Sequence, residues 1–266
     1  MLGQLYSPSG LALETAKAVL DVDNPHAANV ALGCTNGCLY CYGPQASRQG
    51  NKYQSIRFPL DTPLTLIRKQ LQKGLIVQGA FFSFLTDPYL PQLRKQTEEL
   101  VNYLLNWEDE HGQDIKTATL SKIGISDYSG NRNGVTIVSP YKGFTEKYEP
   151  SVLSPKDRIK LISQTADDGG YSWVSMEPWP VQDIYPYDIN DIKEFWEDLA
   201  HDCVDFIVFG KWNYDPRSRT EKARQEYAEI IPQFIDFCND HGIRYHVKSD
   251  TLDFISISSK ELRRDD

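Results

Sequence analysis

The feature that most constrains the fold of this chain is the alternation of short apolar segments with stretches of helical period. Each apolar segment is rich in β-branched or aromatic residues and is bounded by turn residues, as expected for a buried strand. Strands that alternate with helices form parallel βαβ units, in which helices cover the sheet. The predicted strands are Ala28–Gly33, Ala80–Leu85, Lys116–Ser121, Val135–Ser139, Ser172–Met176 and Phe206–Gly210, with Arg244–Val247 as a candidate seventh.

The helices between these strands have clear start and stop signals. Thr62 and Ser154 each precede a proline, which places an N-cap before a first-turn proline in two of them. Pro232 lies inside the last long helical stretch and predicts a kink or two shorter helices there. The predicted helices are Leu11–Leu20, a helix from Pro63 to Gly74, Leu93–Asn106, a helix from Pro155 to Gly169, Asp191–Ala200 and Thr220–Asn239.

The number of strand–helix units bounds the architecture. The chain has 266 residues, which is long enough for one barrel-like α/β domain. Six units fall short of the eight in a closed barrel, and the third connection, Ile123–Asn133, is short and rich in Gly, Asn, Ser and Asp. We expect an N-terminal extension over residues 1–26, one α/β unit over residues 27–257 and a charged tail over residues 258–266.

A polar or charged residue follows each of the first six predicted strands. In parallel α/β folds, ligands bind at the carboxyl ends of the strands, which lie at one rim of the sheet. Any strand can end in a polar residue, but six successive ends with different chemistries favour a convergent site. These residues are Cys34, Thr86 with Asp87, Lys122, Ser139, Glu177 and Lys211.

Charge and hydropathy narrow the classes of function. The chain carries 28 basic and 37 acidic residues, a net charge of −9, which argues against a generally basic nucleic-acid-binding surface. No apolar run is long enough to span a membrane. The N-terminus lacks the basic start and apolar core of a secretory signal. The sequence therefore predicts a cytoplasmic protein.

Three of the five cysteines lie close together, directly after the first predicted strand. Cys34, Cys38 and Cys41 have the spacing C-x3-C-x2-C. An odd number of cysteines without an export signal argues against a disulfide framework, so these thiols indicate a metal site. Three thiolates from one loop can hold three irons of a cubane and leave the fourth iron open to a small ligand. A zinc site is the alternative, but it would need a fourth Cys or His, and none follows nearby.

The cysteine motif after the first strand, with an aromatic residue before the third cysteine, resembles the radical S-adenosylmethionine (SAM) superfamily. The resemblance implies a partial (β/α)6 TIM-like barrel, which agrees with the six units counted above. It also implies a 4Fe–4S cluster on Cys34, Cys38 and Cys41, with SAM chelating the fourth iron. One electron would then cleave SAM to methionine and a 5′-deoxyadenosyl radical, which abstracts a substrate hydrogen.

Shorter motifs are similar to the branch of that superfamily that contains spore photoproduct lyase and proteins like DNA repair photolyase. They lie between about residues 9 and 210. The motifs are Ser9-Gly10-Leu11-Ala12-Leu13-Glu14, Cys41-Tyr42 with Pro44, Thr86-Asp87-Pro88-Tyr89, Glu149-Pro150 with Arg158, and Glu177-Pro178 with Pro180.

The match to this branch implies contacts between individual residues and SAM. Lys122 matches a lysine expected to contact the SAM carboxylate, and Ser139 matches the serine beside it. Thr86 matches a hydroxyl near the methionyl end of SAM. Asp87 and Glu177, at the same rim, complete the expected cofactor-binding set.

Tyr40 and Tyr42 match two tyrosines that flank the third cysteine, lie near SAM and are linked to hydrogen transfer. One position departs from the branch. In the lyase, a cysteine two residues before the hydroxyl matched by Thr86 returns a hydrogen to the product radical, whereas this chain has Phe84 there. We therefore expect no efficient lyase reaction, with Tyr42 or Tyr40 as the remaining hydrogen relay.

These observations predict a radical SAM enzyme that acts on a small-molecule or nucleotide-type substrate. Its electron would come from a donor such as flavodoxin or ferredoxin. A nucleic acid substrate is compatible with the resemblance but is not indicated by the charge. Two alternatives stay open. One is an activase that installs a glycyl radical in a partner protein, and the other is a zinc-binding structural module.

Overall fold

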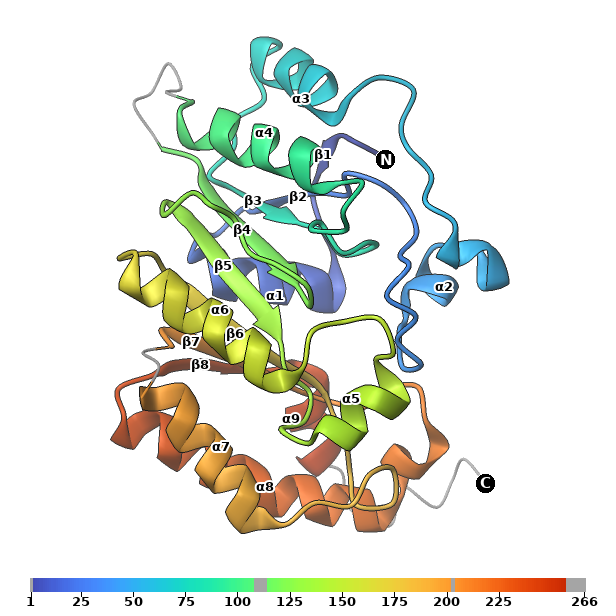
Figure 1. Ribbon diagram of the computed structural model, residues 1–266, viewed down its shortest axis with the longest axis vertical. Coiled ribbons are helices and arrows are strands. Elements are labelled where there is room, and N and C mark those ends of the chain that lie inside the picture. The colour runs from blue at the N-terminus through green and yellow to red at the C-terminus, as the bar shows by residue number, and fades with distance from the viewer. Residues whose placement is uncertain (1, 108–113, 202–203, 257–266) are drawn as a thin grey trace.

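The computed structural model describes residues 2–107, 114–201 and 204–256 (Figure 1). Its strands are β1 (Leu5–Tyr6), β2 (His26–Ala28), β3 (Gly79–Phe82), β4 (Lys116–Ser121), β5 (Asn131–Thr136), β6 (Ser172–Trp179), β7 (Phe206–Lys211) and β8 (Arg244–Val247). Its α-helices are α1 (Gly10–Leu20), α2 (Gly43–Ala46), α3 (Pro63–Gln72), α4 (Arg94–Leu105), α5 (Lys142–Tyr148), α6 (Pro155–Asp167), α7 (Ile189–His201), α8 (Glu221–Asp240) and α9 (Ser249–Ser256). The 3₁₀ helices are η1 (Gly50–Gln54) and η2 (Pro216–Arg219). Cys203 and the predicted tail, residues 258–266, lie outside the described residues.

The strands form one sheet in chain order, from β1 to β8. β2 to β8 are parallel, whereas β1 runs antiparallel to β2 and pairs Leu5 with Ala28. Within the described ranges β1 and β8 form the two edges, so the sheet stays open. The predicted parallel α/β architecture is confirmed. This order brings the carboxyl ends of β2 to β8 to one rim.

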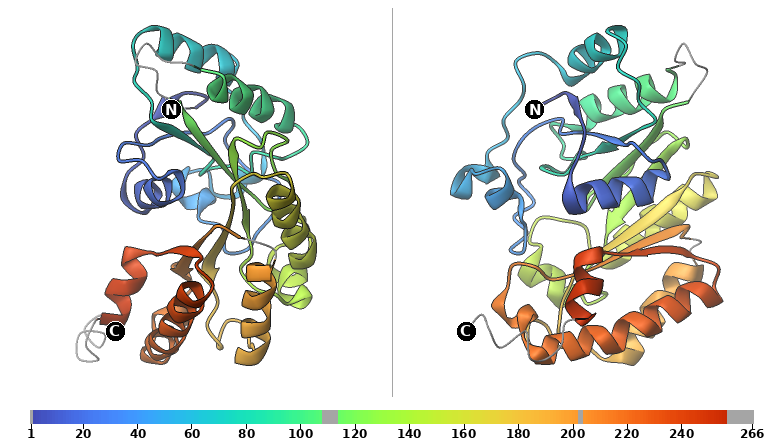
Figure 2. Two further views of the ribbon diagram at one scale, coloured as in Figure 1. Left: turned by 90° about the vertical axis from the view of Figure 1, so that its left-hand side faces the viewer. Right: turned by 180° about the vertical axis from the view of Figure 1, so that it is seen from behind.

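Strand residues alternate between two packed faces, because successive side chains of a strand point in opposite directions. Phe82 packs among residues of α3 and α4, and Val174 packs among residues of α6 to α8. Their neighbours Phe81 and Trp173 point to the other face, where they meet Leu20 of α1. Seen from behind, α1 lies across that face (Figure 2). The segment predicted as an N-terminal extension thus supplies the edge strand β1 and the helix α1. We call the face that α1 covers the inner face of the sheet.

The predicted helix starts agree with the structure. Thr62 accepts a hydrogen bond from the Thr65 N–H at the start of α3, and Ser154 accepts one from Asp157 at the start of α6. The predicted division of the last long helix is wrong, because α8 runs as one helix through Pro232. Proline has no N–H to donate to the carbonyl four residues earlier in the helix. Because Pro232 is exposed, water can reach that carbonyl instead. No helix of the described ranges is long and apolar enough to cross a membrane.

Several predicted strand boundaries differ from the structure: β3 ends at Phe82 rather than Leu85, and β6 continues to Trp179 rather than ending at Met176. At two other strands, buried asparagines replace or extend the backbone hydrogen bonds of the sheet. Ala28–Gly33 is not a strand beyond Ala28, because the Asn29 side chain accepts hydrogen bonds from the backbone N–H groups of Phe84 and Leu85, at 3.0 and 2.9 Å. The chain therefore leaves the sheet before the cysteine loop.

The strand predicted at Val135–Ser139 lies instead at Asn131–Thr136. Asn131 and Asn133 are buried and bond to each other at 2.7 Å. Such polar residues suggest a loop in the sequence, but here they satisfy one another inside the sheet. The connection from β4 to β5 contains no helix in residues 122–130, as its composition predicted.

Candidate active site

A cavity of about 580 Å³ lies at the rim of the sheet, bounded by the cysteine loop and by α1. Its volume is in the range of small-molecule and cofactor sites, roughly 300–1,000 Å³. Residues at the carboxyl ends of β3 to β8 contribute to its wall. They are Ser83 and Phe84, Ser121 and Lys122, Thr136, Ser175 and Glu177, Lys211, and Lys248.

The structure brings most of the sequence-predicted site residues into this one wall. Those present are Cys34, Cys38, Cys41, Tyr40, Tyr42, Thr86, Asp87, Lys122, Glu177 and Lys211. Ser139 is not among them. Because β5 ends at Thr136, the chain has left the rim at Ser139, whose hydroxyl accepts a hydrogen bond from the Tyr141 N–H at 3.3 Å. Thr136 and Ser175 supply hydroxyls to the wall instead.

The cysteine loop is held against the rim by backbone contacts. The Cys34 N–H donates to the Tyr53 carbonyl at 2.9 Å, and the Leu39 N–H donates to the Tyr148 carbonyl at 2.9 Å. Gly33 has φ +104, and a Cβ there would lie 2.5 Å from the Ser55 carbonyl oxygen. Only glycine fits at this position, which lets the chain turn from the sheet into the loop.

The three thiols share this wall, and burial affects the protonation of Cys34 and Cys38. Burial raises the pKa of Cys34 to about 11 and that of Cys38 to about 12. A bound metal would therefore have to displace protons from these thiols. At Cys41 the Gly43 N–H donates to the sulfur at 3.3 Å.

The three thiols of the cavity wall provide a donor set whose fit to a cluster can be examined. In the part of the chain that the structure describes, no three His, Cys, Asp or Glu side chains are grouped to hold one ion. A structural zinc site needs four such ligands on one ion. In a 4Fe–4S cluster each cysteine binds a different iron, so three cysteines suffice and the fourth iron stays open. Three separate thiols beside an open cavity fit a 4Fe–4S cluster with space for a small ligand.

Thr86 and Asp87 connect the loop to the sheet. The Thr86 hydroxyl donates to the Gly33 carbonyl at 2.6 Å. Asp87 accepts hydrogen bonds from the Asn36 amide at 2.8 Å, the Ser121 hydroxyl at 2.6 Å and the Lys122 N–H at 2.9 Å. Asp87 thus holds the cysteine loop and the end of β4 at a fixed separation.

A buried charge network lies behind Tyr40. The Tyr40 hydroxyl donates to Glu149 and accepts from the Lys122 ammonium at 2.9 Å, while that ammonium lies 3.3 Å from Glu149. Arg158 pairs with the other oxygen of the same carboxylate. Burial alone would raise the pKa of Glu149, but Lys122 and Arg158 lower it, so the carboxylate is ionised. Burial and Glu149 raise the pKa of Tyr40 well above its ordinary value, which keeps the hydroxyl protonated.

Glu149 and Arg158 are missing from the predicted site residues although they support it. Glu149 lies one residue past α5, and Arg158 lies on α6. The sequence signal was the motif Glu149-Pro150 with Arg158, which was identified but given no role at the site.

A second charged group of the cavity wall contains Lys248 and Glu177. The Lys248 ammonium donates to the Leu11 carbonyl of α1 at 2.9 Å and lies 3.6 Å from Glu177. Burial raises the pKa of Glu177, and Lys248 opposes that effect. Lys211 pairs with Asp250 at 3.3 Å. Lys248 was not predicted, because it follows the candidate seventh strand, which had no assigned place at the rim.

Phe84 and Tyr42 lie together in the wall. The Tyr42 hydroxyl donates to the Phe84 carbonyl at 2.5 Å. The Phe84 ring stacks on Phe81, with centroids 4.5 Å apart and planes 11° apart. Cys238 is buried in the outer core, away from the cavity. In the described ranges, the thiols of the cavity wall are therefore those of the cysteine loop.

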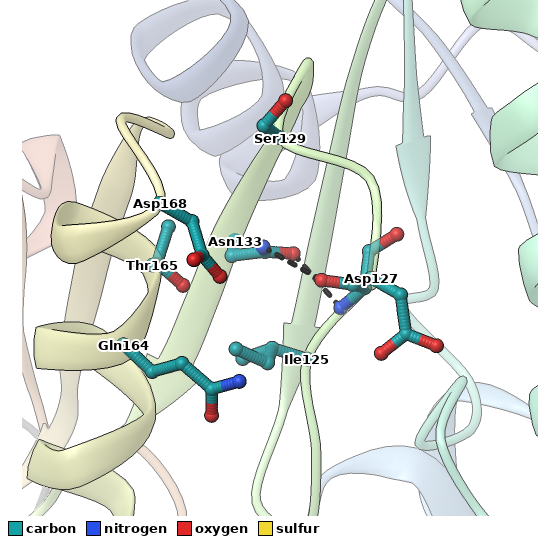
Figure 3. Close-up of a pocket in the computed structure, with 8 residues that line it drawn as sticks. Ile125, Asp127, Ser129, Asn133, Gln164, Thr165 and Asp168 are labelled. Carbon is teal, nitrogen blue, oxygen red and sulfur yellow. Dashed lines mark hydrogen bonds between the residues drawn. The ribbon is translucent and has the colours of Figure 1, made fainter.

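A smaller polar pocket of about 140 Å³ lies between the β4–β5 connection and α6 (Figure 3). Its Asn133 amide donates to the Ser126 carbonyl at 3.1 Å and accepts from the Ser126 N–H at 3.0 Å. Asp127 pairs with Arg94 at 2.8 Å. These groups hold the β4–β5 connection in place. The candidate site is therefore the larger cavity at the cysteine loop.

Comparison with known proteins places the fold. No protein-family model matches the chain, and no curated protein matches it in sequence. Among solved structures, spore photoproduct lyase complexed with dinucleoside spore photoproduct matches with a TM-score of 0.62 and 14% identity, over 84% of this chain and 76% of that one. The chain has the fold of this lyase.

A second solved structure agrees. Streptococcus suis SuiB bound to S-adenosylmethionine matches with a TM-score of 0.55 and 10% identity, over 90% of this chain and 55% of SuiB. This chain thus spans about half the length of SuiB. The lyase and SuiB are both radical SAM enzymes with a partial TIM barrel. The predicted partial barrel of radical SAM type is therefore confirmed as the fold.

Proposed function

We propose that this chain is a radical SAM enzyme in which Cys34, Cys38 and Cys41 hold a 4Fe–4S cluster. The observation that supports this most directly is the position of the three thiols. They share one cavity wall at the carboxyl ends of parallel strands, in the fold of a radical SAM lyase. When bound, the cluster and SAM supply reductive cleavage of SAM to methionine and a 5′-deoxyadenosyl radical, which abstracts a substrate hydrogen.

The residues around the thiols have supporting roles in this proposal. Thr86 and Asp87 fix the loop against β4 through the hydrogen bonds to Gly33 and Asn36. Attachment of the loop on both sides keeps the thiols at a fixed separation, which a preorganised site requires.

Lys122 is the proposed partner of the SAM carboxylate. Its ammonium lies in the cavity wall, but it also contacts Glu149 and the Tyr40 hydroxyl. A SAM carboxylate would therefore share the ammonium with Glu149, and Tyr40 would hold the lysine in place. We propose the Thr136 and Ser175 hydroxyls as additional polar contacts, since Ser139 lies away from the wall. We propose that Glu177, which also lines the cavity, contacts the SAM amino group or the substrate.

The proposed substrate is a small or nucleotide-type molecule rather than the thymine dimer that the lyase repairs. Phe84 has no S–H to return a hydrogen to a product radical, and Cys238 lies elsewhere. Tyr42 is 38% exposed and in the wall, so it is the proposed hydrogen relay if a product radical is quenched. Rapid thymine-dimer repair without consumption of SAM would contradict this part of the proposal.

The test is anaerobic reconstitution with iron and sulfide, followed by assays of iron content, visible absorption and 5′-deoxyadenosine release with dithionite and SAM. We expect Cys41→Ala to lose iron and SAM cleavage. The matched control is Cys238→Ala, which removes a buried thiol remote from the cavity and should keep both. Full iron content and SAM cleavage in Cys41→Ala, or a colourless wild-type protein that binds zinc, would overturn the proposal.

A further inference from the structure

The segment that follows the cysteines differs in charge from the rest of the chain. Between Asp23 and Asp61 there is no acidic residue, although the whole chain has 37 acidic residues and a net charge of −9. The same stretch contains Arg48, Lys52 and Arg57. We call residues 43–57, which include α2 and η1, the basic flap.

The three cations of the basic flap are exposed and unengaged. In the described part of the chain, no side-chain hydrogen bond or ion pair involves Arg48, Lys52 or Arg57, and none of the three lies in the cavity wall. Phe58 and Leu60 follow directly and are 48% and 109% exposed. The flap projects beside the body of the molecule (Figure 1). Exposed cations next to exposed apolar side chains are typical of a protein-binding surface.

The basic flap is also connected directly to the thiols. Its Gly43 N–H donates to the Cys41 sulfur at 3.3 Å, and its Tyr53 carbonyl accepts from the Cys34 N–H at 2.9 Å. Tyr53 is buried, and its hydroxyl donates to the Leu85 carbonyl at 3.0 Å. A partner seated on the flap would therefore be separated from the cysteines by a thin layer of protein.

We propose that the basic flap is the docking surface of an acidic one-electron carrier protein of the flavodoxin or ferredoxin type. This inference rests on the proposed function, because cleavage of SAM consumes one electron. In the step, the carrier is oxidised by one electron and the cluster is reduced by one electron. Complementary charge steers such encounters and raises their rate, and redox partners meet through small interfaces.

The observations favour a protein over a nucleic acid. Single-stranded nucleic acids bind to grooves in which aromatic rings stack on successive bases. The one large aromatic of the flap itself, Tyr53, is buried, and Phe58 lies just beyond the flap. The short connection to the thiols suits electron transfer to a cluster held there.

The test uses the reconstituted protein and a triple charge reversal, Arg48→Glu, Lys52→Glu and Arg57→Glu. The matched control reverses three exposed lysines on or next to the outer helices, Lys73→Glu, Lys156→Glu and Lys193→Glu, and has the same net charge. Photoreduced flavodoxin and reduced ferredoxin are mixed with each protein, and the rate of cluster reduction is followed by visible absorption. At low salt, we expect at least one carrier to reduce the cluster of the flap variant roughly tenfold or more slowly than that of the control. High salt should remove the difference.

Dithionite separates this proposal from the proposed function. It is a small reductant that needs no docking surface, so SAM cleavage driven by dithionite should be the same in the flap variant, the control and the wild type. Loss of dithionite-driven cleavage in the flap variant alone would overturn the docking proposal, because the three cations would then serve the cofactor site.

Three further results would also overturn it. The first is equal reduction rates in the flap variant and the control with both carriers. The second concerns a labelled single-stranded oligonucleotide: the wild type binds it and the flap variant does not, while cluster reduction in the flap variant is as fast as in the control. The third is a cluster-bearing wild type that cleaves no SAM with dithionite, in which case the proposed function fails and the docking proposal fails with it.

Discussion

Arg158 and Glu149 form a buried ion pair behind the cavity, and removing Arg158 should destabilise the fold strongly. The Arg158 side chain is 0% exposed and that of Glu149 is 1% exposed. Arg158 also donates to the Leu153 carbonyl at 2.9 Å and to the Thr136 carbonyl at 2.5 Å. Arg158→Leu would leave a buried carboxylate and two carbonyls without these donors.

The expected loss follows from the burial of the pair. Removing one partner of a buried ion pair costs about 3–5 kcal/mol, because the remaining charge loses its compensation. Lys122 stays 3.3 Å from Glu149 and retains part of that compensation. We therefore expect the lower end, a loss of about 3 kcal/mol in the free energy of unfolding. In a domain of this size such a loss lowers Tm by roughly 6–12 °C.

The control is an exposed ion pair on the neighbouring helix. Lys142 and Glu146 lie 3.2 Å apart on α5, with side chains 81% and 63% exposed. Such a pair contributes about 0.3–0.5 kcal/mol, so Lys142→Leu should change stability little. Urea unfolding followed by tryptophan fluorescence measures both variants. If Arg158→Leu loses no more than about 0.5 kcal/mol beyond Lys142→Leu, the assignment of a stabilising buried pair is refuted.

Three further variants test the loop, the ligand and the pH dependence. Lys122→Ala should weaken SAM binding by roughly tenfold, because a charge-assisted hydrogen bond to the SAM carboxylate is lost. The iron content should stay unchanged. An unaltered affinity for SAM in equilibrium dialysis would contradict the proposed role of Lys122. Thr86→Val removes the hydrogen bond to the cysteine loop and should lower the free energy of unfolding by about 1 kcal/mol, and iron retention should fall with it. Burial would raise the pKa of Glu14, but hydrogen bonds from Ser249 and His246 outweigh burial and lower that pKa. The ionised Glu14 carboxylate therefore stabilises the fold above the pKa of about 4.3 that the residue has in the unfolded chain. This stabilisation is lost as the pH falls. Glu14→Gln should therefore lose less stability than the wild type between about pH 5 and about pH 3, and equal urea midpoints for the two proteins across that range would refute this reasoning.

Features that depend on local chemistry could be predicted from the sequence. The caps at Thr62 and Ser154 need only a hydroxyl before the first turn, and both accept the expected backbone hydrogen bond. β4 and β8 have the predicted bounds, because their apolar residues are framed by turn residues. The cysteine spacing placed three thiols on one short loop, and the structure brings all three into one cavity wall.

Features that depend on distant partners could not be predicted. The buried Asn131 and Asn133 belong to a strand because other polar groups surround them, and no local pattern shows this. The resulting shift of β5 removed Ser139 from the rim. Glu149 and Lys248 owe their positions to partners many residues away in the chain, so single-residue patterns gave them no role.

The docking of α1 on the inner face has a consequence for the order of synthesis. Glu14 bonds to His246 at 2.6 Å and to the Ser249 N–H at 2.7 Å, across 232 and 235 residues. As the chain emerges from the ribosome, α1 cannot form these contacts until nearly the whole protein has been made. Such long-range contacts slow folding and expose apolar surface in intermediates. The cysteines are synthesised early, but the cavity they line is not enclosed until the last strand has been made. Cluster insertion should therefore be a late, post-translational event.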